Sequence, residues 1–124
     1  MANRLLVIED DEQLLAVISE YFEALGYEVH RAVEREEADA LLNNFDYSLV
    51  VTDLSLTKVG LEGLDLLKKI SEQVLRPTVF VLSGHSSPDH REAALAKGAD
   101  IFLQKPFPML ALGELVNRVL GAQA

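Results

Sequence analysis

Residues 4–11 read RLLVIEDD, and this short stretch decides the fold more than any other part of the chain. A strand-length run that is almost wholly apolar ends abruptly in consecutive carboxylates, a pattern typical of a buried strand whose carboxyl end reaches solvent. Residues 12–25 then carry apolar side chains at helical spacing, and Gly26 follows where the end of a helix favours glycine. The first unit is therefore predicted to be a strand followed by a helix.

The same unit recurs along the rest of the chain. Further strands are predicted at 27–31, 49–52, 78–82 and 101–103. Further helices are predicted at 34–43, at 64–70, between Pro88 and Gly98, and at 112–119. Strands that alternate with helices need right-handed crossovers, which build a parallel sheet with helices on both faces. The predicted fold class is thus α/β, with five parallel strands in a doubly wound arrangement.

Length and composition fit one globular domain that spans residues 1–124. The chain has no cysteine, which excludes a disulfide scaffold and a cysteine-ligated metal. Its net charge of −9, from 11 basic and 20 acidic residues, disfavours direct binding to nucleic acid. The apolar runs are strand-sized and no signal-peptide pattern is present, so we expect a soluble, cytoplasmic protein that makes no membrane contact.

Polar side chains stand at the points where four of the predicted strands end. In chain order they are Glu9, Asp10, Asp53, Ser83 and Lys105. In an open parallel sheet, ligands bind outside the carboxyl ends of the strands, where the strand order reverses. Crowded carboxylates repel one another and are tolerated beside a cation, and all-oxygen ligation suits Mg²⁺. The sequence therefore predicts a site for a hard divalent ion.

The same side chains suit phosphoryl transfer. Asp53 offers a carboxylate nucleophile, and a metal held by Asp10 and Asp53 neutralises the oxygens of an incoming phosphoryl group. The compact ammonium of Lys105 balances the charge on the opposite side, and the Ser83 hydroxyl donates to a phosphoryl oxygen. Together these groups predict an acyl-phosphate site centred on Asp53.

Four motifs, in the same chain order, resemble those of response regulator receiver domains in two-component signal transduction, the chemotaxis regulators included. They are Val7-Ile8-Glu9-Asp10, Val51-Thr52-Asp53, Val81-Leu82-Ser83-Gly84 and Leu103-Gln104-Lys105-Pro106-Phe107. The resemblance covers nearly the whole chain and implies a flavodoxin-like (βα)5 fold with strand order 2-1-3-4-5. It also implies a signalling domain rather than an enzyme, one that catalyses only its own phosphorylation and dephosphorylation.

The resemblance further implies the roles of individual residues. Glu9, Asp10, Asp53 and the backbone carbonyl of Ser55 would bind Mg²⁺ or Mn²⁺. Asp53 would be phosphorylated by a sensor histidine kinase or a phosphotransfer protein. The Ser83 hydroxyl and the Lys105 ammonium would contact the phosphate.

Other positions would affect switching and the lifetime of the phosphate. The Lys105-Pro106 bond is expected to be cis, and Phe102 stands where the family often has a switching aromatic residue. Phosphorylation would shift the face made by the fourth helix, the fifth strand and the fifth helix toward a downstream output domain or protein. The chain would act as a monomer or a phosphorylation-dependent dimer. His85 and Ser55 border the position of the attacking water, and the loop after Asp53 departs from the family by its greater length.

Two other functions remain open at this point. One is a receiver-like module that binds proteins without being phosphorylated, which the presence of the full residue set disfavours. The other is a flavodoxin-like cofactor binder or small α/β enzyme. An acidic first strand end disfavours the latter, because a phosphate-binding loop would offer backbone N–H groups instead of carboxylates.

Overall fold

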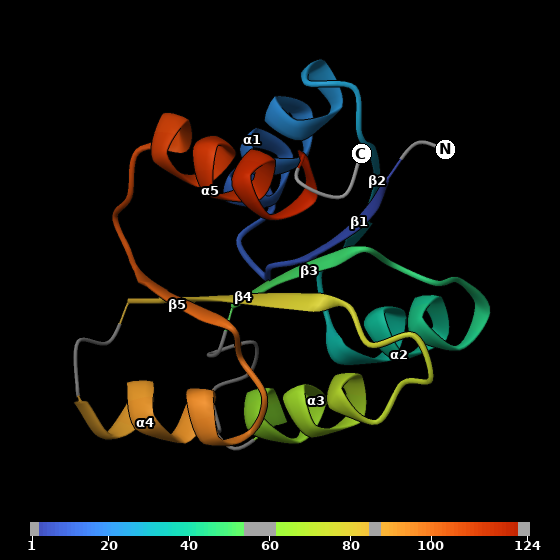
Figure 1. The fold of residues 1–124 in the computed structure, drawn as a ribbon, viewed down its shortest axis with the longest axis vertical. Coiled ribbons are helices and arrows are strands. Elements are labelled where there is room, and N and C mark those ends of the chain that lie inside the picture. The colour runs from blue at the N-terminus through green and yellow to red at the C-terminus, as the bar shows by residue number, and fades with distance from the viewer. Residues whose placement is uncertain (1–2, 54–61, 85–87, 122–124) are drawn as a thin grey trace.

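The computed structural model of the chain describes residues 3–53, 62–84 and 88–121. Across these residues strands and helices alternate (Figure 1). The strands are β1 (Arg4–Ile8), β2 (Glu28–Ala32), β3 (Leu49–Asp53), β4 (Thr78–Ser83) and β5 (Ile101–Gln104). The helices are α1 (Glu12–Ala24), α2 (Arg35–Asn44), α3 (Glu62–Ser71), α4 (Pro88–Ala96) and α5 (Met109–Gly121).

The strands form one parallel sheet in the order β2-β1-β3-β4-β5, which confirms the predicted fold class and strand order. Figure 1 shows α1 and α5 on one face of this sheet and α2, α3 and α4 on the other. Both faces are therefore covered, and all five residues of β3, in the middle of the sheet, are buried. The strand order reverses between β1 and β3, so the carboxyl ends of these two strands mark the expected binding position.

Side chains alternate between the two faces along each strand. Leu5 and Val7 of β1 pack in the core beneath α1 and α5, whereas Leu6 and Ile8 pack in the core beneath α2, α3 and α4. In β3, Leu49 and Val51 pack on the α1 and α5 side and Val50 packs on the other, so the alternation assigns Asp53 to the side of Leu49 and Val51. The Asp53 carboxylate therefore stands at the end of a row of apolar side chains, and burial of β3 on both faces of the sheet fixes the position of this row.

The observed element boundaries differ from the predicted ones most at α5. This helix begins at Met109, ahead of the predicted start at Leu112, because the Pro108 carbonyl accepts a hydrogen bond from the Leu112 N–H at 3.2 Å. The first turn is exposed at Leu110, so it adds no residue to the apolar periodicity from which the start was predicted. The strand β2 is also displaced by one residue, and it lies at the edge of the sheet, where burial constrains its side chains least.

The helices are short, and α1 and α5 are amphipathic. α1 and α5 have 13 residues each, and α1 buries one stripe made by Leu15, Ile18 and Phe22. Gly26 follows α1 with a φ of 99°, a left-handed conformation that explains why a glycine stands at the predicted end of this helix. Among the helices in the described part of the chain, none has both the length and the apolar character needed to span a membrane.

Candidate functional site

The predicted polar residues lie at one edge of the sheet because the strand ends are in register. Thr52 of β3 pairs with Ile8 of β1, so the residues that follow them come next to one another. Glu9 stays aligned with the sheet because its N–H donates to the Ala32 carbonyl at 3.0 Å. On the other side of β3, Asp53 pairs with Leu82 of β4, directly before Ser83. The register thus brings four of the five predicted residues to adjacent strand ends.

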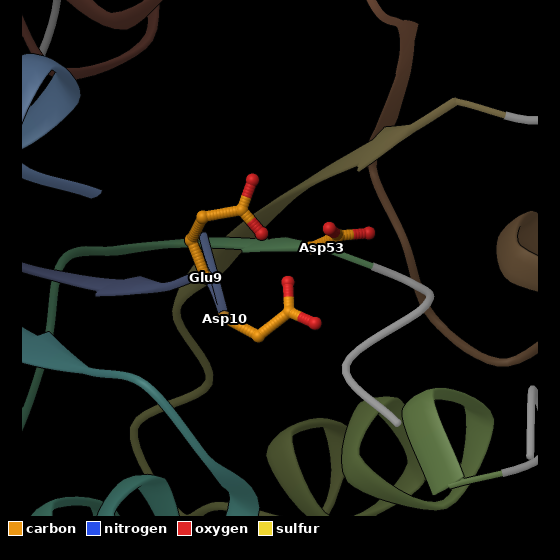
Figure 2. Close-up of side chains that lie close together, drawn as sticks. All are labelled: Glu9, Asp10 and Asp53. Atoms are coloured by element: carbon orange, nitrogen blue, oxygen red, sulfur yellow. The ribbon is translucent and has the colours of Figure 1, made fainter. Parts of the chain in front are cut away.

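Three carboxylates converge at this edge (Figure 2). Glu9, Asp10 and Asp53 each offer an oxygen that lies within 4.8 Å of the other two. Glu9 and Asp53 are 1% and 5% exposed, respectively, whereas Asp10 is exposed to solvent. Two of the three negative charges are therefore held away from water, which is costly unless a cation lies beside them.

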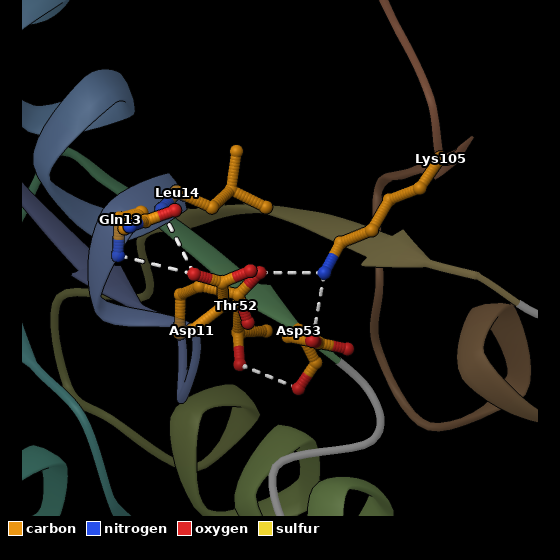
Figure 3. Close-up of polar contacts among 7 residues, drawn as sticks. Asp11, Gln13, Leu14, Thr52, Asp53 and Lys105 are labelled. Carbon is orange, nitrogen blue, oxygen red and sulfur yellow. Dashed lines mark hydrogen bonds and ion pairs between the residues drawn. The ribbon is translucent and has the colours of Figure 1, made fainter.

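Lys105 is such a cation, and it reaches into the cluster from the segment after β5 (Figure 3). Its Nζ donates to Glu9 Oε1 at 2.5 Å and to Asp53 Oδ2 at 2.9 Å. The backbone of Lys105 is held in turn by a 2.7 Å hydrogen bond from its N–H to the Ser83 carbonyl. The Lys105-Pro106 peptide bond is cis, as predicted.

The buried charges perturb one another. Burial, followed by the neighbouring Asp53 carboxylate, raises the pKa of Glu9 to about 8 even though Lys105 acts against the shift. Burial disfavours the charged form of Lys105, but its hydrogen bonds to Glu9 and Asp53 outweigh this and raise the pKa of the ammonium. One ammonium therefore does not fully compensate Glu9 and Asp53 when both are ionised.

The donor set fits a hard divalent cation. All the available ligand atoms are carboxylate oxygens, which Mg²⁺ and Mn²⁺ accept. Glu9 Oε2 is buried and makes no hydrogen bond within the described residues, so it offers an oxygen that the described chain leaves unsatisfied. The remaining predicted protein ligand, the backbone carbonyl of Ser55, lies outside the described residues.

Ser83 lies beside this site, because it directly follows Leu82, the partner of Asp53, whereas Phe102 lies one strand further along the sheet. Ser83 is fully buried at the carboxyl end of β4. Phe102 is partly buried in β5 and packs against the core beneath α3 and α4. His85, the other residue predicted to modulate the site, lies outside the described residues. Its predicted role, like those of the other site residues, stays a prediction.

Asp11 neighbours the acidic pair but has a different function in the structure. It is the N-cap of α1, where its side chain accepts hydrogen bonds from the N–H groups of Gln13 at 3.0 Å and Leu14 at 3.2 Å (Figure 3). Asp11→Ala is expected to lower the free energy of unfolding by about 1 kcal/mol, measured by urea denaturation. Asp11→Ser, which retains a capping oxygen, should recover most of this loss.

An apolar groove next to Lys105 was not foreseen from the sequence. It has a volume of about 420 Å³ and lies between α1 and the segment that leads into α5. The lining residues are Leu14, Val17, Lys105, Pro106, Phe107 and Met109. Val17 was the one residue of α1 that could have indicated a groove, because it is apolar but lies outside the periodic stripe of the helix. In the structure it is 50% exposed.

Comparison with known proteins gives a consistent result. The family model described as the response regulator receiver domain matches residues 5–119. The transcriptional regulatory protein PmrA of Pectobacterium parmentieri is 37% identical over 116 residues, which cover 94% of this chain and 50% of that protein. The chain thus spans about half the length of the curated relatives it matches.

Solved structures of similar proteins share the fold over almost the whole chain. A CheY-like receiver domain protein from Methanospirillum hungatei JF-1 has a TM-score of 0.90 and 28% identity, with 99% of this chain and 97% of that chain covered. A response regulator from Burkholderia pseudomallei has a TM-score of 0.83 and 26% identity, with 94% and 66% covered. The latter structure contains a phosphorylated aspartic acid, a calcium ion and citrate.

Proposed function

This chain belongs to the response regulator receiver family of two-component systems, and we propose that it accepts a phosphoryl group on Asp53 in a reaction that depends on Mg²⁺. One observation supports this proposal most strongly. Asp53 is a buried carboxylate that lies both within a cluster of three carboxylates and in contact with a lysine ammonium. A nucleophile, a cation site and a fixed positive charge are thus assembled around one side chain.

In the proposed reaction an oxygen of Asp53 forms a bond to phosphorus. The bond from phosphorus to the imidazole nitrogen of a phosphohistidine donor breaks, and the leaving imidazole takes up a proton. The product is an acyl phosphate, which water later hydrolyses to restore the carboxylate. The chain in this way acts on itself alone, as a signalling domain, with a histidine kinase or a phosphotransfer protein as the donor.

Side chains around Asp53 have complementary parts in this proposal. Glu9 and Asp10 hold Mg²⁺ or Mn²⁺ together with Asp53, and the bound metal supplies charge neutralisation for the phosphoryl oxygens. Lys105 contacts Asp53 already and is placed to bind a phosphoryl oxygen. The Ser83 hydroxyl, buried at the neighbouring strand end, donates to another oxygen.

The response of the output surface is proposed to run through β4 and β5. If the Ser83 hydroxyl moves toward a phosphate on Asp53, the packing around Phe102 would change, because Val81 of the same strand as Ser83 pairs with Phe102. Phe102 is only partly buried, so its ring has room to change rotamer. The surface of α4, β5 and α5 would then shift its population between two states and signal to an output domain or protein.

The proposal is tested by exposure of the purified chain to acetyl phosphate, followed by intact mass measurement. We expect a mass increase of one phosphoryl group when Mg²⁺ is present and none when EDTA replaces it. The adduct should disappear after brief treatment with hydroxylamine, which cleaves acyl phosphates but leaves phosphoserine intact. A stable adduct that forms equally well in EDTA would contradict the proposal.

The groove beside Lys105 is the surface we assign to the phosphodonor protein. It combines exposed apolar side chains with direct proximity to the acceptor, because Lys105 contacts Asp53 and also lines the groove. Val17→Asp is expected to slow phosphorylation by a histidine kinase roughly tenfold or more, because it introduces a charge at the centre of an apolar contact. Labelling by acetyl phosphate, which needs no docking surface, should be unchanged.

Val74→Asp is the matched control. Val74 is fully exposed in the connection between α3 and β4, which leads into the amino end of β4 and so lies away from the strand ends that carry the site. The substitution therefore makes the same change of charge at a distance from the groove. Phosphorylation of this variant by the same kinase should proceed at the rate of the unmodified chain. Equal slowing by both variants would show that added negative charge, not the groove, is responsible.

A further inference from the structure

The strand β5 leads directly to Lys105, and its own side chains determine its position along β4 only weakly. β5 lies at an edge of the sheet and pairs with β4 over four residues (Figure 1). Its first three residues, Ile101, Phe102 and Leu103, are all apolar and all partly buried, and residues 79–82 of β4 are apolar as well. A slip of β5 by one residue would exchange one apolar contact for another, so burial alone is a weak selector of the register.

Asp100, directly before β5, makes contacts that favour one register over the others. Its N–H donates to the Val79 carbonyl at 2.9 Å, and its Oδ2 accepts from the Val79 N–H at 2.8 Å. Both backbone groups of Val79, which is 1% exposed, are thus bonded to a single residue. A slip would bring Ala99 or Ile101 to this position, and neither side chain accepts a hydrogen bond. The Val79 N–H would then lose this acceptor in a buried setting, which is costly.

Arg76 and Gly98 hold Asp100 in place. The Arg76 Nη2 donates to the Gly98 carbonyl at 2.7 Å and lies 3.4 Å from Asp100 Oδ1. Gly98 has a φ of 117°, and a Cβ at this residue would lie 3.2 Å from the Ser71 Cβ at the end of α3. The turn between α4 and β5 therefore packs closely against α3 and is bound to the segment that leads into β4.

We propose that Asp100 is a positioning residue, which sets the register of β5 from the amino end of the sheet and thereby places Lys105 beside Asp53. At the other end of β5 the Lys105 N–H donates to the Ser83 carbonyl at 2.7 Å. A strand advances by about 3.3 Å per residue, so a slip of one residue would break the 2.9 Å contact between Lys105 Nζ and Asp53. The link from this register to phosphoryl transfer rests on the proposed function.

The test is amide hydrogen exchange, followed by NMR in the unmodified chain, Asp100→Ala and Asp100→Asn. Asparagine retains an oxygen that can accept from the Val79 N–H, whereas alanine does not. In Asp100→Ala we expect the amides of both Val79 and Lys105 to exchange about tenfold faster, because a lost contact at one end of β5 frees the other end. Asp100→Asn should restore slow exchange at both. A Lys105 amide that stays fully protected in Asp100→Ala would overturn the inference.

Asp39→Ala is the matched control. Asp39 is 32% exposed, against 36% for Asp100, and it also forms ion pairs, with Arg35 at 3.7 Å on α2 and with Lys69 at 3.2 Å on α3. The substitution removes the same carboxylate away from β5, so exchange at the ends of β5 should match that of the unmodified chain. Equal acceleration in this variant would mean that a general loss of stability, not the register, is responsible, and would overturn the inference.

Arg76→Met is a milder variant of the same contacts. It keeps the Asp100 carboxylate but removes the guanidinium that holds it, so we expect the amides at both ends of β5 to exchange faster, by less than in Asp100→Ala. Acceleration confined to the amino end of β5 in both variants would show a local contact without influence on Lys105, contrary to the inference.

Labelling by acetyl phosphate in the presence of Mg²⁺ connects the register to the proposed reaction. We expect Asp100→Ala to be labelled roughly tenfold more slowly, because small displacements of a group that positions reactants slow a reaction strongly. Asp100→Asn and Asp39→Ala should be labelled at the normal rate. Normal labelling of Asp100→Ala would contradict the link between β5 and phosphoryl transfer. Absence of labelling in every protein, the unmodified chain included, would contradict the proposed function, whereas the register of β5 is decided by the exchange rates.

Discussion

Asp53→Asn is expected to abolish the phosphate adduct and, in the same protein, to raise the stability of the metal-free chain. The adduct is lost because an amide oxygen is a poor nucleophile for phosphorus and forms no acyl phosphate. The stability rises because one of three crowded carboxylates becomes neutral while Lys105 keeps its bond to Glu9. We expect the free energy of unfolding in EDTA to increase by on the order of 1 kcal/mol.

Asp39→Asn gives the corresponding change outside the site. Asp39 also forms an ion pair with a lysine, Lys69, but belongs to no cluster of carboxylates in the described residues. This variant should be labelled by acetyl phosphate normally and should be no more stable than the unmodified chain in urea denaturation. An adduct that survives in Asp53→Asn would transfer the acceptor role to Asp10 or Glu9 and would contradict the proposal.

The sheet could be predicted from the sequence because its central strands are buried on both faces. β1, β3 and β4 are almost completely buried, and each ends where the apolar run meets a polar residue. Their carboxyl ends meet at one edge of a parallel sheet, so the cluster of Glu9, Asp10 and Asp53 followed from the order of the strands alone. The ends of exposed helices lack this signal, which is why the first turn of α5 was missed.

Contacts between side chains of the site were less predictable. The sequence indicated that Lys105 balances charge near the phosphate, but it did not indicate an ion pair with Glu9, which depends on the reach of both side chains across the strand ends. The groove was hidden for a similar reason. It is formed by α1 and by residues some ninety positions later, and the two become neighbours only when α1 and α5 pack on the same face.

The repulsion among the carboxylates of the site is offset by the apolar burial of the strands that carry them. The register of β1 and β3 brings the carboxylates together, and the free energy of apolar burial in the strands must offset their repulsion. The apolar rows that end in Glu9 and Asp53 supply this burial, since Leu5, Val7 and Val51 are fully buried. Fully buried apolar side chains therefore lie directly next to the crowded carboxylates.

Glu9→Gln is expected to stabilise the metal-free chain progressively as the pH rises. In the folded chain, burial and the neighbouring Asp53 carboxylate raise the pKa of Glu9 from 4.5 to about 8. A raised pKa in the folded state gives a contribution to stability that is fully present below pH 4.5 and is lost as the pH rises through about 8. Glutamine does not titrate, so the variant escapes this loss while its amide oxygen still accepts from Lys105.

The measured quantity is the difference in free energy of unfolding between Glu9→Gln and the unmodified chain in EDTA. We expect this difference to be small near pH 4.5 and to grow to on the order of 5 kcal/mol in favour of the variant above pH 8. Glu20→Gln, an exposed change on α1, should show no such trend. Saturating Mg²⁺ should reverse the order of stability at high pH, because the unmodified chain has the full set of charged ligands. A difference that stays constant with pH would mean that Glu9 is ionised throughout, with Lys105 alone sufficient to hold its charge.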